Sequence, residues 1–231
     1  KPGMSRDDLL GTNAKIMRQV AEGIKTYAPN AFLIVITNPI DAMVTLAKRV
    51  TGFPKNRVVG QSGILDSSRY RTFIAQELKV SVASVSALVL GGHGDDMVPV
   101  RSGCHLSGVP IEKFISSQRL NEIEARVRNA GGEIVSLLKT GSAFYSPASA
   151  AIRMTEAYLL DKKEILPCAA YLEGEYRVQG YYFGVPVMIG AGGVERVIEI
   201  ELSPREKKAF EESLGHVKEL VQAMDRVLAA S

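Results

Sequence analysis

Residues 31–36 read AFLIVI, a short apolar run that ends at Thr37-Asn38-Pro39. The run is too short for a helix, and it is too uniformly apolar for a strand with one face in water. This pattern is typical of a strand that is buried on both faces in a parallel sheet. We therefore expect an α/β fold, and the flanking segments support this expectation.

Helical and strand patterns alternate around the run. Ser5, Asp7 and Asp8 predict a helix start, because serine caps the first turn and carboxylates favour the positive end of the helix dipole. Apolar spacing predicts helices over 7–27, 40–50 and 64–78, and strands over 31–36, 57–60 and 85–90. This alternation predicts βαβ units. Only two parallel-type strands come first, so we expect half of a doubly wound sheet to be absent from the sequence.

The pattern changes from about residue 85. Met97-Val98-Pro99-Val100 and the turn at 107–110 predict antiparallel strands, and helices over 117–139 and 147–160 precede a strand-rich block over 166–201. A final helix begins at Ser203-Pro204-Arg205-Glu206, which combines a capping box with proline at the first helical position. We place a domain boundary between residues 1–62 and 63–231.

Composition excludes several classes of protein. The 231 residues are 46% hydrophobic and carry a dispersed net charge of +3, so there is no basic stripe for nucleic acid and no membrane-spanning run. Cys104 and Cys168 form no metal-binding spacing, which favours a reduced, cytoplasmic protein. The first residues, 1–4, form neither a signal peptide nor a translation start, so the chain is expected to begin within a longer protein.

A glycine cluster over 190–193 resembles the start of a dinucleotide-binding fingerprint. Glu195 stands at the third glycine position, and residues 194–202 read as strand where a phosphate-binding helix should begin. We therefore predict a hairpin turn.

Asp66, Arg69 and His93 are the candidate functional residues. Asp66 and Arg69 project from one face of the helix over 64–78, although an exposed ion pair is the simpler interpretation of that spacing. His93 lies among glycines at a strand end and suits proton transfer, although a structural histidine is the simpler alternative. Metal ligation with Asp95 and Asp96 is disfavoured, because neighbours on an extended segment point to opposite faces and no second histidine has ligand spacing.

Four motifs occur in order at compatible spacings. They are Lys1-Pro2-Gly3-Met4-Ser5-Arg6, Ile36-Thr37-Asn38-Pro39, Ile64-Leu65-Asp66-Ser67-Ser68-Arg69 and Gly91-Gly92-His93-Gly94-Asp95. Over essentially its whole length the sequence resembles the lactate/malate dehydrogenase family, and within it the lactate-dehydrogenase-like bacterial malate dehydrogenases. The resemblance implies the second half of a doubly wound NAD-binding (Rossmann) domain, followed by an α+β catalytic domain with antiparallel sheets. It also implies an NAD-dependent oxidoreductase of the tricarboxylic acid cycle, acting on a small dicarboxylate as a homodimer or homotetramer.

The resemblance assigns a role to each matching residue. His93 matches the catalytic acid/base and Asp66 its carboxylate partner; Arg69 matches the arginine that binds the substrate carboxylate, and Arg6 the loop arginine that polarises the reacting carbonyl. Asn38 matches a residue that contacts both substrate and cofactor. The remaining expected cofactor contacts are Asn13, Ile36 and Thr37.

Two elements of the family pattern lie outside the sequence: the glycine fingerprint with its ribose-binding acid, and the arginine before Lys1 that selects oxaloacetate over pyruvate. A lactate or other 2-hydroxyacid dehydrogenase is therefore an alternative. A non-catalytic dinucleotide-binding scaffold and a metal-dependent hydrolase are alternatives from other classes.

Overall fold

The computed structural model describes residues 6–139 and 141–229, with side chains from Leu10 onward. The helices are α1 (Arg6–Tyr27), α2 (Ile40–Thr51), α3 (Gly63–Leu78), α4 (Ser117–Leu138), α5 (Tyr145–Leu159) and α6 (Pro204–Ala229). The strands are β1 (Leu33–Val35), β2 (Val58–Gly60), β3 (Val85–Gly91), β4 (Met97–Leu106), β5 (Val109–Pro110), β6 (Glu164–Glu173), β7 (Gln179–Gly190) and β8 (Gly193–Val197). These bounds lie close to the predicted helices and strands, and the α/β fold is confirmed. Within the described ranges, no helix is long and apolar enough to cross a bilayer.

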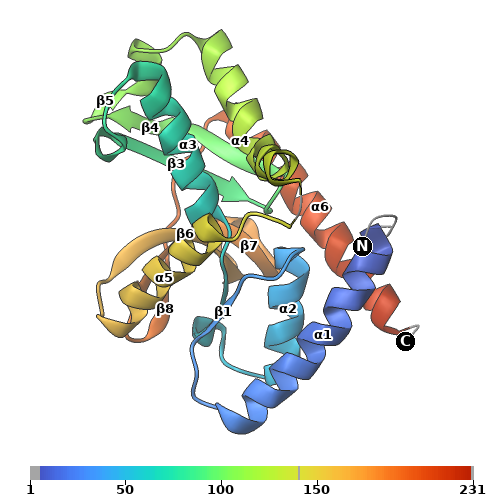
Figure 1. Cartoon of the computed structure of the whole chain (residues 1–231). Coiled ribbons are helices and arrows are strands. Elements are labelled where there is room, and N and C mark those ends of the chain that lie inside the picture. The colour runs from blue at the N-terminus through green and yellow to red at the C-terminus, as the bar shows by residue number, and fades with distance from the viewer. Residues whose placement is uncertain (1–5, 140, 230–231) are drawn as a thin grey trace.

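The strands form two sheets (Figure 1). The larger sheet has the order β1-β2-β6-β7-β8, with β1 and β2 parallel and the other pairs antiparallel. The predicted parallel pair and the strand-rich block therefore belong to one sheet, joined where Gly60 pairs with Ala169. A Cβ at Gly60 would lie only 2.9 Å from the Cβ of Ala169, so glycine permits this close approach. The smaller sheet, β3-β4-β5, is antiparallel as predicted.

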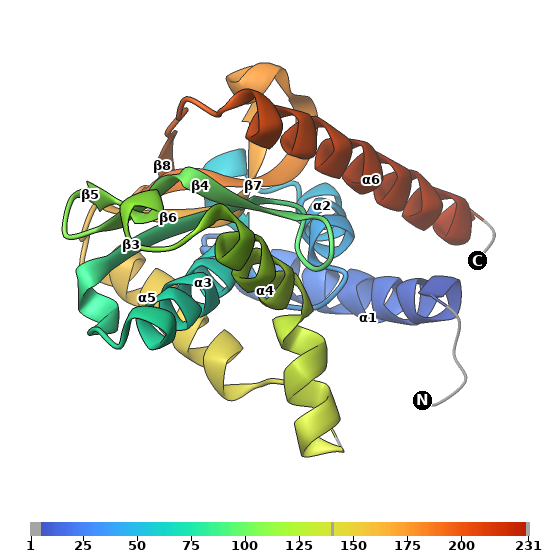
Figure 2. The same cartoon turned by 90° about the horizontal axis from the view of Figure 1, so that it is seen from above.

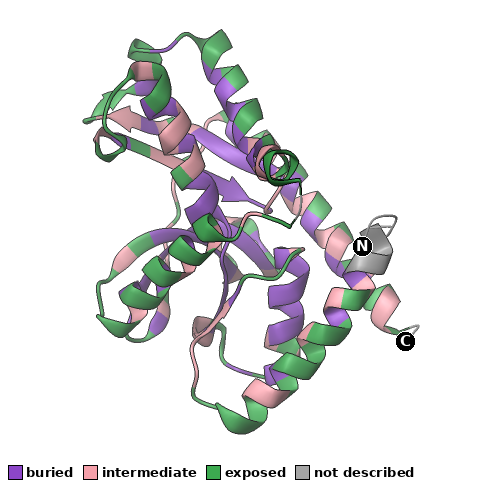
Figure 3. Cartoon of the chain, in the orientation of Figure 1, coloured by how far each residue is buried: buried purple, intermediate pink, exposed green. Residues whose placement is uncertain are grey.

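Helices cover both faces of the larger sheet. Successive residues of a strand point to opposite faces. Accordingly, Cys168 and Ala170 of β6 pack in one core cluster with Met154 of α5, whereas Ala169 packs in another with Met43 of α2. Figure 2 shows α1 and α6 side by side, and both contact α2. Most of α2 is buried beneath them, while α1 and α5 keep exposed outer faces (Figure 3).

The glycine cluster forms a hairpin, as predicted. Gly190 pairs with Gly193 at the turn between β7 and β8, and Gly193 has a φ of +85°, a conformation that favours glycine. The predicted extent of the following strand is wrong, because β8 ends at Val197 and residues 198–203 are irregular. The strand register ends at the pair of Val187 and Val197, and one further backbone hydrogen bond runs from the Ile198 amide to the Pro186 carbonyl oxygen at 2.8 Å.

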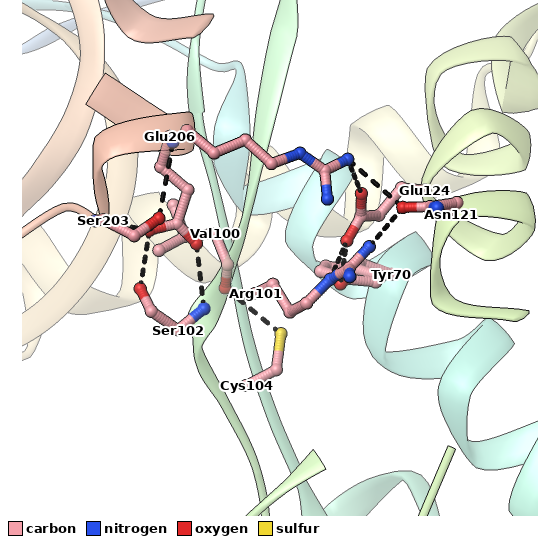
Figure 4. Close-up of polar contacts among 10 residues, drawn as sticks. Tyr70, Val100, Arg101, Ser102, Cys104, Asn121, Glu124, Ser203 and Glu206 are labelled. Atoms are coloured by element: carbon pink, nitrogen blue, oxygen red, sulfur yellow. Dashed lines mark hydrogen bonds and ion pairs between the residues drawn. The ribbon is translucent and has the colours of Figure 1, made fainter. Parts of the chain in front are cut away.

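The capping box at the start of α6 is present (Figure 4). Ser203 Oγ accepts a hydrogen bond from the Glu206 amide, and Glu206 Oε2 accepts one from the Ser203 amide at 2.8 Å. The other carboxylate oxygen, Oε1, accepts the amide of Ser102 in β4 at 2.9 Å. Glu206 therefore both starts the helix and attaches it to the smaller sheet.

Candidate active site

Glycines set the shape of the loop that carries His93. Gly91 ends β3 with a φ of +86°, and a Cβ there would lie 2.8 Å from Ser213 Oγ. A Cβ at Gly92 would lie 2.9 Å from a methyl carbon of Val217. Because both positions lack a side chain, the loop packs closely against α6.

The start of α3 lies against the same strand. A Cβ at Gly63 would be 2.5 Å from the carbonyl oxygen of Val89, so only glycine fits at the first position of this helix. Ser67 Oγ then accepts the Val89 amide at 2.9 Å. These contacts fix the first turns of α3 beside the end of β3, which brings Asp66 next to His93.

The Asp66 carboxylate contacts both of the other predicted residues. Its Oδ2 lies 2.8 Å from His93 Nδ1, and its Oδ1 accepts a hydrogen bond from an Arg69 guanidinium nitrogen at 3.3 Å. The side chains are 2% exposed for Asp66, 12% for Arg69 and 15% for His93. The interpretation of Asp66 and Arg69 as an exposed ion pair is therefore wrong, because both groups lie in the protein interior.

Electrostatics in this cluster favour the charged imidazole. Burial lowers the pKa of His93, but the charge of Asp66 and its hydrogen bond outweigh burial, so the net pKa is raised. The guanidinium of Arg69 opposes this effect to a smaller extent. The arrangement can therefore hold a proton on the imidazole and fix which ring nitrogen faces the carboxylate.

Asp41 is a neighbour of His93 that sequence reasoning missed. It stands in the first turn of α2 and is 3% exposed, and its Oδ2 accepts the backbone amide of His93 at 3.1 Å. Burial raises the pKa of Asp41 to about 6 despite that hydrogen bond. The only sequence signal was an acid at a helix start, which the helix dipole already explains.

The predicted cofactor residues gather at the carboxyl end of β1. Ile36, Thr37 and Asn38 follow the strand and are exposed. Asn13 Nδ2 donates to the carbonyl oxygen of Asn38 at 2.7 Å, so α1 supports this segment. The side chain of Arg6, and the residues of the first motif before it, lie outside the described part of the chain.

Asp96, close to His93 in the chain, is paired with a histidine of α6. Asp95 and Asp96 lie in a turn, not on the extended segment expected from the sequence. Asp96 Oδ1 lies 2.6 Å from Nδ1 of His216 on α6. Among the residues that the structure describes, no cluster of three or more His, Cys, Asp or Glu side chains suits a metal ion.

Comparisons with known proteins identify the family. Residues 1–60 match the model of the NAD-binding domain of lactate/malate dehydrogenases, and residues 64–230 match the model of their α/β C-terminal domain. The chain belongs to the lactate/malate dehydrogenase family. The family resemblance predicted from the sequence motifs is thereby confirmed.

Individual relatives of this lactate/malate dehydrogenase chain show how far the likeness extends. A malate dehydrogenase of Rhodopirellula baltica is 58% identical over 229 residues, which are 99% of this chain and 73% of the relative. The structure of the Salinibacter ruber malate dehydrogenase has a TM-score of 0.95 at 47% identity, with 98% of this chain and 74% of that one covered. A lactate dehydrogenase of Eimeria maxima, solved with NADH and oxamate, has a TM-score of 0.95 at 44% identity, with coverage of 99% and 71%.

The residues present fit the reactive end of NAD. Ligands of open α/β sheets bind beyond the carboxyl ends of parallel strands, where β1 presents Ile36 to Asn38. After β2, the buried atoms Gln61 Nε2 and Ser62 Oγ have no hydrogen-bond partner among the described residues. Unpaired polar atoms at this edge of the sheet are consistent with a site for a polar ligand.

Proposed function

We propose that the protein containing this chain is an NAD-dependent malate dehydrogenase, which interconverts malate and oxaloacetate. The observation that carries the proposal is the buried Asp66 carboxylate, which lies within hydrogen-bond distance of both the His93 imidazole and the Arg69 guanidinium. The oxidation of a 2-hydroxy acid requires a group that accepts the hydroxyl proton and, beside it, a group such as an arginine that binds the carboxylate. The relatives that are 55–58% identical carry the name malate dehydrogenase.

His93 is the acid/base in this proposal. Asp66 faces Nδ1, so a proton on that nitrogen leaves Nε2 to accept the hydroxyl proton of malate. In the reverse direction the imidazolium returns the proton to the carbonyl oxygen. The nicotinamide, when bound, takes up or supplies the hydride.

Arg69 orients the substrate by its carboxylate. Its guanidinium makes one hydrogen bond to Asp66, and its Nε is buried without a partner in the described part of the chain. A planar fork with free donors matches a carboxylate in two parallel bonds, which lysine cannot make. We assign Arg6 to the reacting carbonyl and Asn38 to both substrate and cofactor, with Asn13, Ile36 and Thr37 as further cofactor contacts.

The wider setting follows from the same proposal. We infer a cytoplasmic enzyme of the tricarboxylic acid cycle, since Cys104 and Cys168 are both free thiols. Half-exposed Ile16 and Val20 on α1 suit the interface of a homodimer or homotetramer. The domain boundary proposed after residue 62 places His93, Asp66 and Arg69 together in the second domain.

The test follows NADH absorbance with oxaloacetate or pyruvate as substrate, using the protein and its His93→Asn variant. We expect a strong preference for oxaloacetate and a loss of about 10²- to 10⁴-fold in kcat for the variant. His105→Asn is the matched control, because His105 lies on β4, away from Asp66 and Arg69 on α3, and its Nδ1 lies 3.2 Å from the carbonyl oxygen of Gly103. Preference for pyruvate would favour a lactate dehydrogenase, and near-normal turnover of His93→Asn would exclude the acid/base role.

A further inference from the structure

Two buried side chains hold the backbone on which His93 is mounted. Ser213 Oγ accepts the Gly92 amide at 2.9 Å, and Asp41 Oδ2 accepts the next amide, that of His93, at 3.1 Å. The two acceptors are 2% and 3% exposed. They come from α6 and α2, so consecutive amides of the loop are attached to two different helices.

A negative charge is not required to accept the His93 amide. An uncharged hydroxyl performs the same task at Ser213, whereas a buried carboxylate carries a desolvation cost. The other carboxylate oxygen, Oδ1, is buried and has no hydrogen-bond partner among the described residues. No lysine or arginine is paired with Asp41 in the described part of the chain. The positive charge that attracts the Asp41 carboxylate is the imidazolium of His93.

Among the described residues, the charges with the largest effect on the pKa of His93 come from two helices, with Asp66 and Arg69 on α3 and Asp41 on α2. The helix α6 presents the uncharged Ser213 and also His216, whose Nδ1 lies 2.6 Å from Asp96 Oδ1 of the same loop. The charge of Asp41 attracts the imidazolium and so helps to raise the pKa of His93, after the larger effects of Asp66. Above about pH 6 Asp41 itself is mainly ionised.

We propose that Asp41 is a positioning residue for the dehydrogenase reaction, which fixes the backbone of His93 and supplies a second negative charge that favours its imidazolium form. The catalytic meaning of this inference rests on the proposed function. Asp41 acts through His93 and not on the substrate. The effect of Asp41 on the reaction rate therefore depends on pH and on whether malate is oxidised or oxaloacetate is reduced. A purely structural contact would not produce this dependence.

Two substitutions separate the two contributions. Asp41→Asn keeps a side-chain oxygen for the His93 amide but removes the charge. Malate oxidation needs neutral His93, and oxaloacetate reduction needs the imidazolium. Because the variant lowers the pKa of His93, the midpoint of the pH–rate profile should move to lower pH for both reactions. At alkaline pH we expect kcat/KM for reduction to fall about three- to tenfold. Asp41→Ala removes the acceptor as well, and we expect kcat to fall about 10²-fold in both directions.

Nuclear magnetic resonance provides a readout that requires no cofactor or turnover. The chain has three histidines, so variants of His105 and His216 assign the ring signal of His93. In the cofactor-free protein, the midpoint of the His93 titration should lie at lower pH in Asp41→Asn than in the unaltered protein. Glu206→Gln is the matched control, because Glu206 is also a buried carboxylate that accepts a backbone amide, that of Ser102.

The outcomes separate this inference from the proposed function. Absence of any reaction with oxaloacetate in the unaltered protein would exclude the proposed function. The resonance titration would still show whether the charge of Asp41 raises the pKa of His93. An unchanged His93 titration in a folded Asp41→Asn variant would overturn the inference. So would an equal shift in the Glu206→Gln control.

Discussion

Replacing Asp41 by asparagine should stabilise the folded protein at neutral pH. Burial raises the pKa of Asp41 to about 6, from an ordinary value of 3.8. A group whose pKa is raised by folding stabilises the folded state at pH values below the unfolded pKa, and this stability is lost as pH rises through the folded pKa. At about 1.4 kcal/mol for each unit, the ionised carboxylate costs about 3 kcal/mol above pH 6.

The measurement is the free energy of unfolding by urea at several pH values between 4 and 8, for the unaltered protein and for Asp41→Asn. We expect the difference in favour of the variant to grow by about 2 kcal/mol from pH 4 to pH 8, since part of the roughly 3 kcal/mol is already lost at pH 4, just above the unfolded pKa. The lower pKa of His93 in the variant changes the difference in the same direction, because His93 then contributes less stability at low pH. A difference independent of pH, or one that grows in favour of aspartate, would refute this reasoning.

Three further substitutions test the surroundings of His93. Asp66→Asn should lower kcat about 10²- to 10⁴-fold in steady-state assays, because the imidazolium loses its hydrogen-bonded counter-charge, and a loss below tenfold would contradict that role. Arg69→Lys should raise KM for oxaloacetate about tenfold or more with a smaller change in kcat, and an unchanged KM would count against the carboxylate fork. Gly184→Ala should destabilise the fold by about 2 kcal/mol in thermal unfolding, because its Cβ would lie 2.2 Å from the Gly91 carbonyl oxygen; an unchanged midpoint would show that the strands can separate without cost.

Local signals carried most of the correct predictions. The capping box of Ser203 and Glu206 needs only neighbours within one helical turn, and the structure contains both of its hydrogen bonds. The hairpin at 190–193 depends on glycine conformations that are also local. The apolar run at 31–36 correctly located β1, but the expected burial on both faces is wrong, because β1 is the edge strand of the sheet among the described residues, with Leu33 and Ile34 only partly buried.

Long-range pairings left no such trace. The contact between Gly60 and Ala169, which merges the parallel pair with the antiparallel strands, depends on tertiary packing. Asp41 was overlooked for the same reason, since it meets the His93 amide 52 positions away in the chain. Asp66 was found through the motif that it shares with Arg69.

The attachment of the Gly92 amide to Ser213 joins positions 121 residues apart, and this separation bears on synthesis of the chain. A ribosome makes β3 and its loop long before it makes α6, at about 5 to 20 residues per second. The Gly92 amide therefore lacks its native acceptor for several seconds after the loop has been translated. A nascent chain that stops before α6 can bond the His93 amide to Asp41 but not the Gly92 amide to Ser213. The loop that carries His93 therefore reaches its native conformation only late in translation.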